Sequence, residues 1–340
     1  MKLAVVGTGY WGVNLVRNFA ELSTLACVCD IDFQKAKQIS LKYGGRPCFC
    51  LEEVLHSVDA VVIATPAPTH HQLARQALLA GKDVFVEKPI TLRCAECEDL
   101  IEIAERKRLV LMVGHLLLYH PAITRLREIV GSGKLGDIEY VYSNRLNFGK
   151  VRRQENALWS FAPHDISVIL YLLDGELPLQ VSAVGGTYLQ PNIADVTVSH
   201  MLFDRGIRSH IFVSWLHPYK EQRLVVVGSK AIMAFDDLAT GSKLQLFNKN
   251  ISIKNGQFVT KKPVGTPVPY EEEEPLTAEC RHFIHCIETR QNPRSDGRDG
   301  LRVLSVLQAC HRSLQLNGEP LLLNAVQPPI PAQQLAAAIA

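Results

Sequence analysis

Along the first 115 residues, short apolar runs alternate with longer segments in which apolar residues recur every three or four positions. The run at 59–64 (DAVVIA) shows no alternation with polar residues, which is typical of a strand covered on both faces of a parallel sheet. Strands that alternate with helices of this length predict right-handed crossovers and a doubly wound sheet. The predicted strands are 2–6, 25–29, 59–64, 83–86 and 109–113. Two predicted helices end near residues 22 and 43, and two more span residues 69–80 and 92–107.

After about residue 118 the pattern changes, because strand-like runs follow one another with few helices between them. Such successive strands predict an open, mostly antiparallel sheet. The expected fold class is α/β, with a doubly wound parallel sheet in residues 1–118 and a second α/β domain in residues 119–340 that ends in a Pro- and Ala-rich tail. The expected elements of the second domain are a helix at 121–130, a strand at 138–145, a helix near 163–173, strands between 179 and 247, and helices at about 275–289 and 297–316.

Length and charge limit the classes of function. At roughly 150 residues per domain, 340 residues suggest two domains. Lys and Arg total 36 against 34 Asp and Glu, and this balance gives no general reason to bind nucleic acid or an anionic membrane. No apolar run approaches the roughly 18 to 20 residues of a spanning helix, and the N-terminal apolar stretch is too short for a signal peptide. We therefore expect a cytoplasmic protein with no nucleic-acid or membrane partner.

The nine cysteines agree with a reducing compartment, because their number is odd and no export signal is visible. Cys94 and Cys97 form a C-x-x-C pair, but neither a second zinc-ligand pair nor a thioredoxin-like context accompanies it. Free thiols are the favoured interpretation of all nine cysteines, and no metal site is expected.

The first predicted strand ends in a complete G-x-G-x-x-G motif, residues 7–12, which we call the glycine loop. Gly7 is expected to make the tight turn, Gly9 to let the backbone approach a pyrophosphate, and Gly12 to let the next helix pack on the strand. The N-terminus of that helix offers N–H groups and a partial positive charge to the phosphates. The motif alone is a weak signal, but its position between strand and helix favours a dinucleotide site that includes Tyr10 and Trp11.

Asp30 ends the second predicted strand, near the distance from the glycine loop at which a ribose-binding acid is expected. A carboxylate there accepts hydrogen bonds from ribose hydroxyls and repels a 2′-phosphate. The sequence therefore favours NAD over NADP. A glycine-rich turn with a surface aspartate is the alternative.

Two further segments follow predicted parallel strands, and ligands bind outside the carboxyl ends of such strands. Thr65 and Pro66, with His70 nearby, follow the strand at 59–64, and Glu87-Lys88-Pro89 follows the strand at 83–86. A glutamate and a lysine directly after a buried strand form either a weak surface ion pair or part of a functional site. Their position beside the expected cofactor favours the second interpretation.

These motifs, in this order and spacing, resemble the glucose–fructose oxidoreductase / inositol dehydrogenase (Gfo/Idh/MocA) family over nearly the whole chain. The resemblance implies a Rossmann domain that binds NAD, followed by an α/β domain whose open sheet commonly forms the interface of homodimers or homotetramers. It places Lys88 near the nicotinamide and the reacting hydroxyl. The expected cofactor-binding residues are Gly7, Gly9, Tyr10, Trp11, Gly12, Asp30, Thr65, Pro66, His70, Glu87 and Lys88.

In the second domain the family usually carries an Asp and a His four residues apart on one helix. His164 matches the His, but Ser160 stands where the Asp is expected, which argues against an inositol-type site. Asp165 follows directly but points about 100° away on a helix, so it is no simple substitute.

This departure points to a subgroup of the family. The chain resembles enzymes that act on nucleotide sugars in bacterial surface-polysaccharide pathways, and the resemblance lies in segments 9–15, 114–121, 145–152 and 155–165. The resemblance implies NAD-dependent oxidation of the C3 hydroxyl of a nucleotide-linked sugar, such as UDP-N-acetylglucosaminuronic acid, to a ketone. A 2-oxo acid is a candidate second substrate that reoxidises the cofactor. The alternatives are oxidation of another sugar, of inositol or of another nucleotide sugar, and a non-catalytic NAD-binding regulator.

Such a substrate carries two phosphates and a carboxylate, so its site should be locally basic. A basic segment at residues 145–153 meets this need, although a solvated loop is the default interpretation of a charge cluster. His164 and Lys88 are the candidate catalytic residues, with His164 slightly favoured as the base. The expected substrate-binding residues are Lys88, Arg145, Asn147, Lys150, Arg153, Asn156 and His164.

Overall fold

The computed structural model describes residues 1–249 and 251–323, so the predicted Pro- and Ala-rich tail lies outside the described residues from 324 onward. Internal contacts divide the chain into two compact units. Unit 1 comprises residues 1–120 and 273–304, and unit 2 comprises residues 121–272 and the residues from 305 onward. Residues 273–304, which the sequence pattern assigned to the second domain, therefore group with the first unit.

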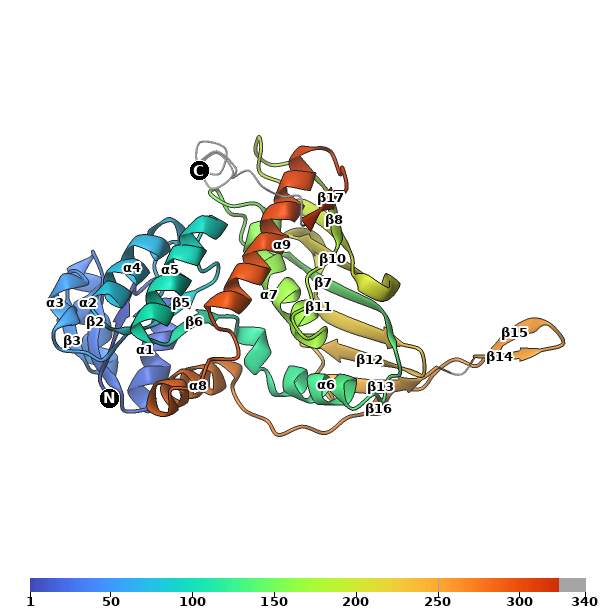
Figure 1. Ribbon diagram of the computed structural model, residues 1–340, viewed down its shortest axis with the longest axis horizontal. Helices are drawn as coiled ribbons and strands as arrows, with labels where there is room; N and C mark the ends of the chain where they lie inside the picture. Colours follow the sequence, from blue (N-terminus) through green and yellow to red (C-terminus); the bar gives the residue numbers. More distant parts are fainter. Residues whose placement is uncertain (250, 324–340) are drawn as a thin grey trace. The chain divides into compact units, whose positions relative to one another are not determined.

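Unit 1 contains a six-stranded sheet with the order β3-β2-β1-β4-β5-β6, in which all neighbouring strands are parallel. The order reverses between β1 and β4, and this is where doubly wound sheets bind their ligands. Figure 1 shows helices on both sides of the sheet. The strands are β1 (Leu3–Val6), β2 (Leu25–Cys29), β3 (Arg46–Cys48), β4 (Ala60–Ile63), β5 (Asp83–Glu87) and β6 (Leu111–Gly114).

The helices of unit 1 connect these strands, except for one that comes from late in the sequence. They are α1 (Gly12–Glu21), α2 (Phe33–Tyr43), α3 (Glu52–Leu55), α4 (His70–Leu79), α5 (Cys94–Lys107) and α8 (Pro275–Thr289), with short 3₁₀ turns η1 (Ala67–Thr69) and η2 (Leu116–Tyr119). Phe283 of α8 packs edge-on against Phe19 of α1 and Phe85 of β5. All three rings are fully buried, so α8 is part of the core of this unit.

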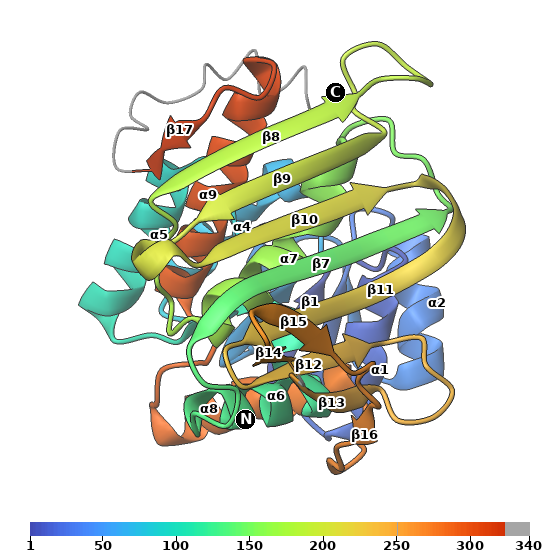
Figure 2. The same ribbon diagram turned by 90° about the vertical axis from the view of Figure 1, so that its right-hand side faces the viewer.

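Unit 2 contains a nine-stranded sheet with the order β16-β13-β12-β11-β7-β10-β9-β8-β17. Among the described strands only the β7–β10 pair is parallel, which confirms the prediction of a mostly antiparallel sheet. Figure 2 shows the strands side by side with α7 behind them. The strands are β7 (Ile138–Phe148), β8 (Gln180–Gly186), β9 (Val196–Leu202), β10 (Arg208–Ser214), β11 (Leu216–Gly228), β12 (Ala231–Asp236), β13 (Leu244–Asn248), β16 (Thr266–Pro267) and β17 (Leu321–Leu322).

The helices of unit 2 cover one face of this sheet, and one of them starts earlier than predicted. They are α6 (Pro121–Gly131) and α7 (Ala157–Leu172), with a 3₁₀ turn η3 (Asp204–Gly206); α9 (Gly297–Gln315) has its second half in this unit. The prediction started α7 near Pro163, because proline favours the first turn of a helix. In the structure Asn156 caps the helix instead, and Pro163 lies buried in its interior.

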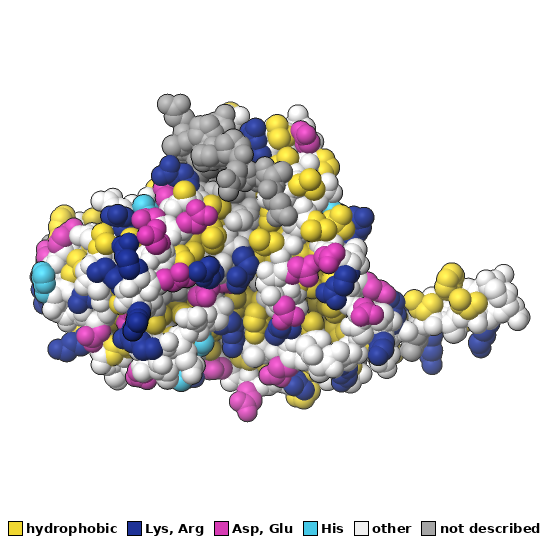
Figure 3. All heavy atoms as spheres, in the orientation of Figure 1, with side chains coloured by type: hydrophobic (Ala, Val, Ile, Leu, Met, Phe, Trp, Pro, Cys, Tyr) yellow, Lys and Arg dark blue, Asp and Glu magenta, His cyan; other side chains and the backbone are white. Residues whose placement is uncertain are grey.

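A two-stranded hairpin, β14 (Ile251–Lys254) and β15 (Gln257–Thr260), was not predicted. Its turn residues Asn255 and Gly256 both have positive φ, and an Asn-Gly pair between strand-like residues is the signal that was available. Figure 3 shows hydrophobic side chains on this hairpin, where Ile253 and Phe258 are 67% and 76% exposed. The same view shows basic and acidic side chains intermixed rather than gathered in one basic patch.

Three other features of the described residues bear on the expectations from the sequence. All nine cysteines are free, and seven of them are buried. No described helix is long and apolar enough to cross a membrane. In residues 1–249 and 251–323, no group of three or more His, Cys, Asp or Glu side chains is arranged to hold a metal ion.

Candidate active site

The glycine loop connects β1 to α1 at the switch point of the six-stranded sheet. Gly7 has a φ of +97°, and a Cβ atom there would lie 2.6 Å from the carbonyl oxygen of Ala64, just after β4. A Cβ atom at Gly12 would lie 2.0 Å from the Gly7 carbonyl oxygen. By contrast, no described atom lies within 4 Å of a Cβ built at Gly9. Gly7 and Gly12 are therefore required by packing, whereas Gly9 leaves an open approach to the backbone.

The first turn of α1 also suits an anion. It contains no acidic residue, and no side chain caps it. Backbone N–H groups at such a helix end, with the partial positive charge of the helix, favour a phosphate. Tyr10 of the loop is 90% exposed, whereas Trp11 is half-buried.

Asp30 lies directly after β2 and contacts the glycine loop. Its Oδ2 accepts hydrogen bonds from the backbone N–H (2.7 Å) and the hydroxyl (2.6 Å) of Thr8, and its Oδ1 accepts one from the Asp32 N–H (2.9 Å). Burial alone would raise the pKa of Asp30, but these hydrogen bonds outweigh burial and lower it. The carboxylate is thus charged at neutral pH. It is only partly buried and has about four acceptor positions, so it retains capacity for ribose hydroxyls.

His70, predicted to bind the cofactor, is buried and holds two loops. Its Nε2 lies 2.8 Å from the Thr65 carbonyl oxygen, and its Nδ1 lies 2.8 Å from the Pro89 carbonyl oxygen. Both ring nitrogens are therefore engaged with backbone after β4 and β5. Thr65 remains half-buried and Pro66 exposed at the carboxyl end of β4. The His70 ring therefore connects the segment after β4 to the segment after β5 and orients both.

Glu87 is the last residue of β5, and several groups surround its carboxylate. The Trp11 indole N–H donates to its Oε1 (2.5 Å), and the Lys88 backbone N–H lies 3.3 Å from its Oε2. A Cβ atom on Gly114, at the end of β6, would lie 3.0 Å from the carboxyl carbon and both oxygens. Burial raises the pKa of Glu87 to about 7 and lowers the pKa of His70, and the Lys88 ammonium is close enough to offset part of the first shift and add to the second. The structure thus brings the predicted residues Trp11, Glu87, Lys88 and His70 together.

Sequence reasoning missed the Trp11–Glu87 contact. The glycine motif leaves its fifth position unspecified, and the two residues are 76 positions apart. The available signal was chemical: a half-buried indole N–H is a donor that needs an acceptor.

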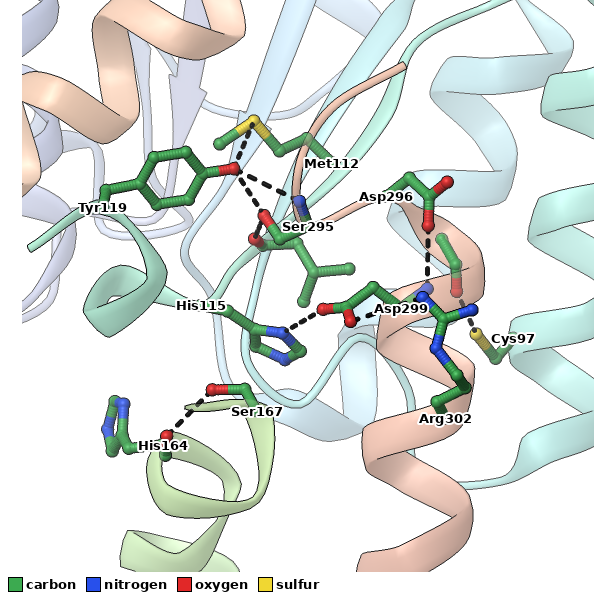
Figure 4. A network of polar contacts seen from close by, with 12 residues as sticks. Cys97, Met112, His115, Tyr119, His164, Ser167, Ser295, Asp296, Asp299 and Arg302 are labelled. Carbon is green, nitrogen blue, oxygen red and sulfur yellow. Dashed lines mark hydrogen bonds and ion pairs between the residues drawn. The ribbon is translucent and has the colours of Figure 1, made fainter. Parts of the chain in front are cut away.

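The segment before α9 is fixed to the end of β6 within the same unit. Figure 4 shows the buried Tyr119 hydroxyl between Ser295 and the Met112 sulfur, and His115 directed at Asp299. The Tyr119 and Ser295 hydroxyls are 2.8 Å apart, and the distance from His115 Nδ1 to Asp299 Oδ2 is 3.0 Å. These buried contacts anchor the segment between α8 and α9 in unit 1.

His164 lies on α7 of unit 2 and is half-buried, and its carbonyl oxygen accepts a hydrogen bond from Ser167 (Figure 4). The next residue, Asp165, is only 2% exposed, and its carboxylate is used in buried contacts within unit 2. It accepts two hydrogen bonds from the Arg145 guanidinium, at 3.0 and 3.1 Å, and one from Ser143. Because the charge of Arg145 is compensated by Asp165, this arginine is less available to a phosphate or carboxylate than the sequence suggested.

The other predicted substrate-binding residues of unit 2 differ in their environments. Asn156 is buried, and its side chain accepts the Trp159 N–H at the start of α7, so it is a helix cap. Asn147 is half-buried, and its Oδ1 has no hydrogen-bond partner among the described residues. Lys150 and Arg153 are exposed. The structure therefore separates two structural residues, Arg145 and Asn156, from two residues open to a ligand.

Comparison with known protein families identifies the family of this chain. Residues 1–115 match the sequence model of an oxidoreductase family with an NAD-binding Rossmann fold, GFO_IDH_MocA, and residues 123–234 match the GFO/IDH/MocA C-terminal domain. The chain belongs to the Gfo/Idh/MocA family. It is therefore an oxidoreductase, and its cofactor is NAD. The open backbone at Gly9, the uncapped start of α1 and the charged Asp30 fit that cofactor.

Curated members of the Gfo/Idh/MocA family include proteins with different substrates. The chain is 28% identical to UDP-N-acetylglucosamine 3-dehydrogenase of Acidithiobacillus ferrooxidans, over 90% of this chain and 94% of that protein. It is also 28% identical to inositol 2-dehydrogenase of Rhizobium meliloti, over 77% of this chain and 80% of that protein.

Solved structures of the family agree with the fold. UDP-N-acetylglucosamine 3-dehydrogenase GnnA from Acidithiobacillus ferrooxidans superimposes with a TM-score of 0.82 at 27% identity, over 93% of this chain and 98% of that chain. GenD2 from gentamicin A biosynthesis, solved in complex with NAD, gives a TM-score of 0.80 at 23% identity, over 96% of this chain and 97% of that chain. The second likeness concerns the fold alone.

Proposed function

We propose that this oxidoreductase oxidises the C3 hydroxyl of a nucleotide-linked sugar with NAD, and that UDP-N-acetylglucosaminuronic acid is the substrate. The observation that carries the dehydrogenase proposal is the Lys88 ammonium beside Glu87 at the carboxyl end of β5, in the same compact unit as the glycine loop and Asp30. Such a cation beside the switch point suits the proton and charge changes of hydroxyl oxidation. The nucleotide-sugar class is supported by the relative that acts on UDP-N-acetylglucosamine.

Oxidation of a ring hydroxyl requires a group that takes the proton. When bound, NAD accepts the hydride from the same carbon. We assign the proton to His164 or Lys88, with His164 favoured because imidazole titrates near neutrality. Lys88 then stabilises the negative charge that develops on the oxygen.

The uronic acid is preferred over the neutral sugar because unit 2 offers exposed cations near its helix α7. Lys150 and Arg153 are exposed, and Arg153 has the planar donor geometry that suits a carboxylate. Arg145 has a structural role in this proposal, because its ion pair with Asp165 connects β7 to α7. Asn147 offers a buried oxygen without a partner among the described residues, which suits a sugar hydroxyl.

A second candidate function is oxidation of inositol, which the inositol 2-dehydrogenase relative favours. Ser160, where the family pattern has Asp, argues against it. The third candidate, a non-catalytic NAD-binding regulator, has no observation in its favour and would have little reason to keep Lys88 beside Glu87.

The deciding experiment mixes NAD-loaded protein separately with UDP-N-acetylglucosaminuronic acid, UDP-N-acetylglucosamine and myo-inositol, each with and without 2-oxoglutarate. Absorbance of reduced nicotinamide and mass spectrometry of a 3-keto sugar are the readouts. We expect reduction with the uronic acid and reoxidation with 2-oxoglutarate. Reduction with the neutral sugar alone would reassign the substrate, and no reduction with any of the three would overturn the proposed function.

Three further parts belong to the same proposal. The face of the nine-stranded sheet opposite α7 carries exposed apolar residues, including Val184 and Val198 at 52% and 40%, and suits a second copy of the chain in a homodimer or homotetramer. The sugar ketone feeds bacterial surface-polysaccharide precursor synthesis. A cytoplasmic location suits both the free thiols and the nucleotide-sugar substrate.

A further inference from the structure

Glu279 is a buried acidic residue to which neither the family motifs nor the mechanism above gives a role. It lies on α8 in the core of unit 1 and is 0% exposed. Neither of its carboxyl oxygens has a hydrogen-bond partner among the described residues. A buried polar group without a partner is costly, so a feature of this kind calls for an explanation.

The groups near Glu279 come from β5, η2 and α8 itself. Glu87 of β5 lies close enough to repel a charge on Glu279, and Tyr119 of η2 and Cys280 of α8 are the other titratable groups near it. The Lys88 ammonium acts on Glu87, the Arg294 guanidinium lies 5.1 Å over the ring of Tyr119, and Arg17 acts on Cys280. Among the described residues, burial and the charge of Glu87 are the influences on Glu279, and no cation offsets them.

The two carboxyl groups have different environments, and this decides which of them ionises. Burial is the largest influence on both. Glu87 is compensated by Lys88, by the Trp11 indole and by the Lys88 N–H, so its pKa is raised only to about 7. Glu279 has no such compensation and also faces the charge of Glu87, so its pKa is raised well above the ordinary value.

We propose that Glu279 remains a neutral carboxylic acid and that Glu87 exchanges a proton with Lys88, so that Glu87 and Lys88 act as a proton relay at the reacting hydroxyl and Glu279 positions it. In the relay an N–H bond of the Lys88 ammonium breaks and an O–H bond on Glu87 forms. The pair of opposite charges becomes a neutral amine and a neutral acid, and the amine becomes an ammonium again when it takes the proton of the reacting hydroxyl. The catalytic use of the relay rests on the proposed function, but the protonation of Glu279 and the coupling of Glu87 to Lys88 do not. Glu279 is a positioning residue, because it acts only through Glu87.

The arrangement has a chemical advantage over a solvated glutamate. An ordinary glutamate is too weak a base to accept a proton from an ammonium group, whereas a carboxyl that titrates near neutrality accepts one at much lower cost. A second charged carboxylate behind Glu87 would oppose its ionisation altogether. A neutral acid excludes water from the same space without adding charge.

The first test measures thermal unfolding of Glu279→Gln against the unchanged protein from about pH 5 to about pH 8. The unfolded chain releases the Glu279 proton near its ordinary pKa, whereas the fold keeps it, so the unchanged protein loses stability as pH rises. Glutamine cannot ionise, and the difference in Tm in its favour should therefore grow with pH. Glu288→Gln, on the exposed side of the same helix, is the control and should give a constant difference.

The slope with pH is the readout, so a constant loss of stability from the substitution does not affect it. Glu279→Met, also unable to ionise, should give the same slope and serves if the glutamine variant does not fold. A difference that stays constant for both variants would show that Glu279 is ionised in the fold, and would overturn the proposal.

The second test measures how fast acetic anhydride acetylates Lys88 at increasing pH, by mass spectrometry of the corresponding peptide. Only the neutral amine reacts. Glu87→Gln removes the adjacent carboxylate and should raise the rate about tenfold near pH 8, the effect of one unit of pKa. Glu279→Gln should stay within about twofold of the unchanged protein. Lys82, half-buried at the other end of β5, is the reference lysine.

An unchanged rate in Glu87→Gln would show that Glu87 and Lys88 are not coupled, and a tenfold rise in Glu279→Gln would show that Glu279 carries the charge. Either result would overturn the relay. Neither test uses a sugar, so both give an answer even if no nucleotide sugar reduces the cofactor. Failure of the proposed function and failure of the relay are thus distinguishable.

Discussion

The strand ends of unit 1 and the basic segment of unit 2 are both candidate ligand sites in the sequence, but the structure treats them differently. In unit 1 the glycine loop offers its backbone, and Asp30 is held charged by the loop itself. In unit 2 the first cation of the segment, Arg145, forms an ion pair with the buried Asp165. The difference teaches that a site built from backbone geometry is encoded locally. The availability of a charged side chain depends instead on partners that are distant in sequence.

The largest effect is expected from the catalytic residues. His164→Asn should slow reduction of bound NAD by UDP-N-acetylglucosaminuronic acid by about 100- to 10,000-fold if His164 is the general base. Single-turnover absorbance of reduced nicotinamide measures the rate, and an unchanged Tm shows that the variant is folded. Near-normal turnover would contradict the assignment and move the proton to Lys88, whose own substitution Lys88→Ala should then show the loss.

The next effect separates the two kinds of arginine in the basic segment. Arg145→Ala should lower the free energy of unfolding by about 3 to 5 kcal/mol, because it leaves the buried Asp165 carboxylate unpaired. Arg153→Ala removes an exposed side chain and should change that free energy by about 0.5 kcal/mol or less, while raising KM for the nucleotide sugar. Urea unfolding and steady-state kinetics are the measurements. Equal losses of stability in the two variants would show that Arg145 and Arg153 have the same structural role.

The glycine loop offers a matched pair at the backbone level. Gly12→Ala places a Cβ atom against the Gly7 carbonyl oxygen and should cost about 1 to 3 kcal/mol of stability. Gly9→Ala meets no described atom, so its Tm should hold, but the methyl group occupies the approach to the pyrophosphate and should weaken NAD binding about tenfold, or 1.4 kcal/mol. Thermal unfolding and calorimetric titration with NAD test the pair. Tight NAD binding by the Gly9 variant would place the cofactor elsewhere.

The smallest effect concerns the choice of cofactor. Asp30→Ala should reduce the preference for NAD over NADP by about tenfold, because the carboxylate that repels a 2′-phosphate is gone. Dissociation constants for both cofactors give the ratio. Since Asp30 also accepts two hydrogen bonds from Thr8, Asp30→Asn is the control that keeps one acceptor while removing the charge. An unchanged ratio in both variants would remove Asp30 from cofactor selection.

Much of the fold followed from the sequence because its signals are local. The parallel strands of unit 1 are continuous apolar runs, and the predicted and observed spans of β2 are identical at Leu25–Cys29. The short β3 was missed because its three residues include Arg46 and Pro47, which carry no apolar pattern. The start of α7 was misplaced because Pro163 imitates a first turn, and only the tertiary structure shows it buried inside the helix.

The residue types and spacing of the sequence by themselves determined the glycine loop, Asp30 and the Glu87-Lys88 pair, because turn geometry and the carboxyl ends of parallel strands depend on short stretches of chain. Tertiary structure alone decided three other matters: that α8 packs into unit 1, that Trp11 binds Glu87, and that Glu279 stands unpaired behind it. The physical reason is that burial and charge compensation are properties of neighbours in space. Glu279 is one acidic residue among 34 in the sequence, and only the folded protein removes its water and its partners.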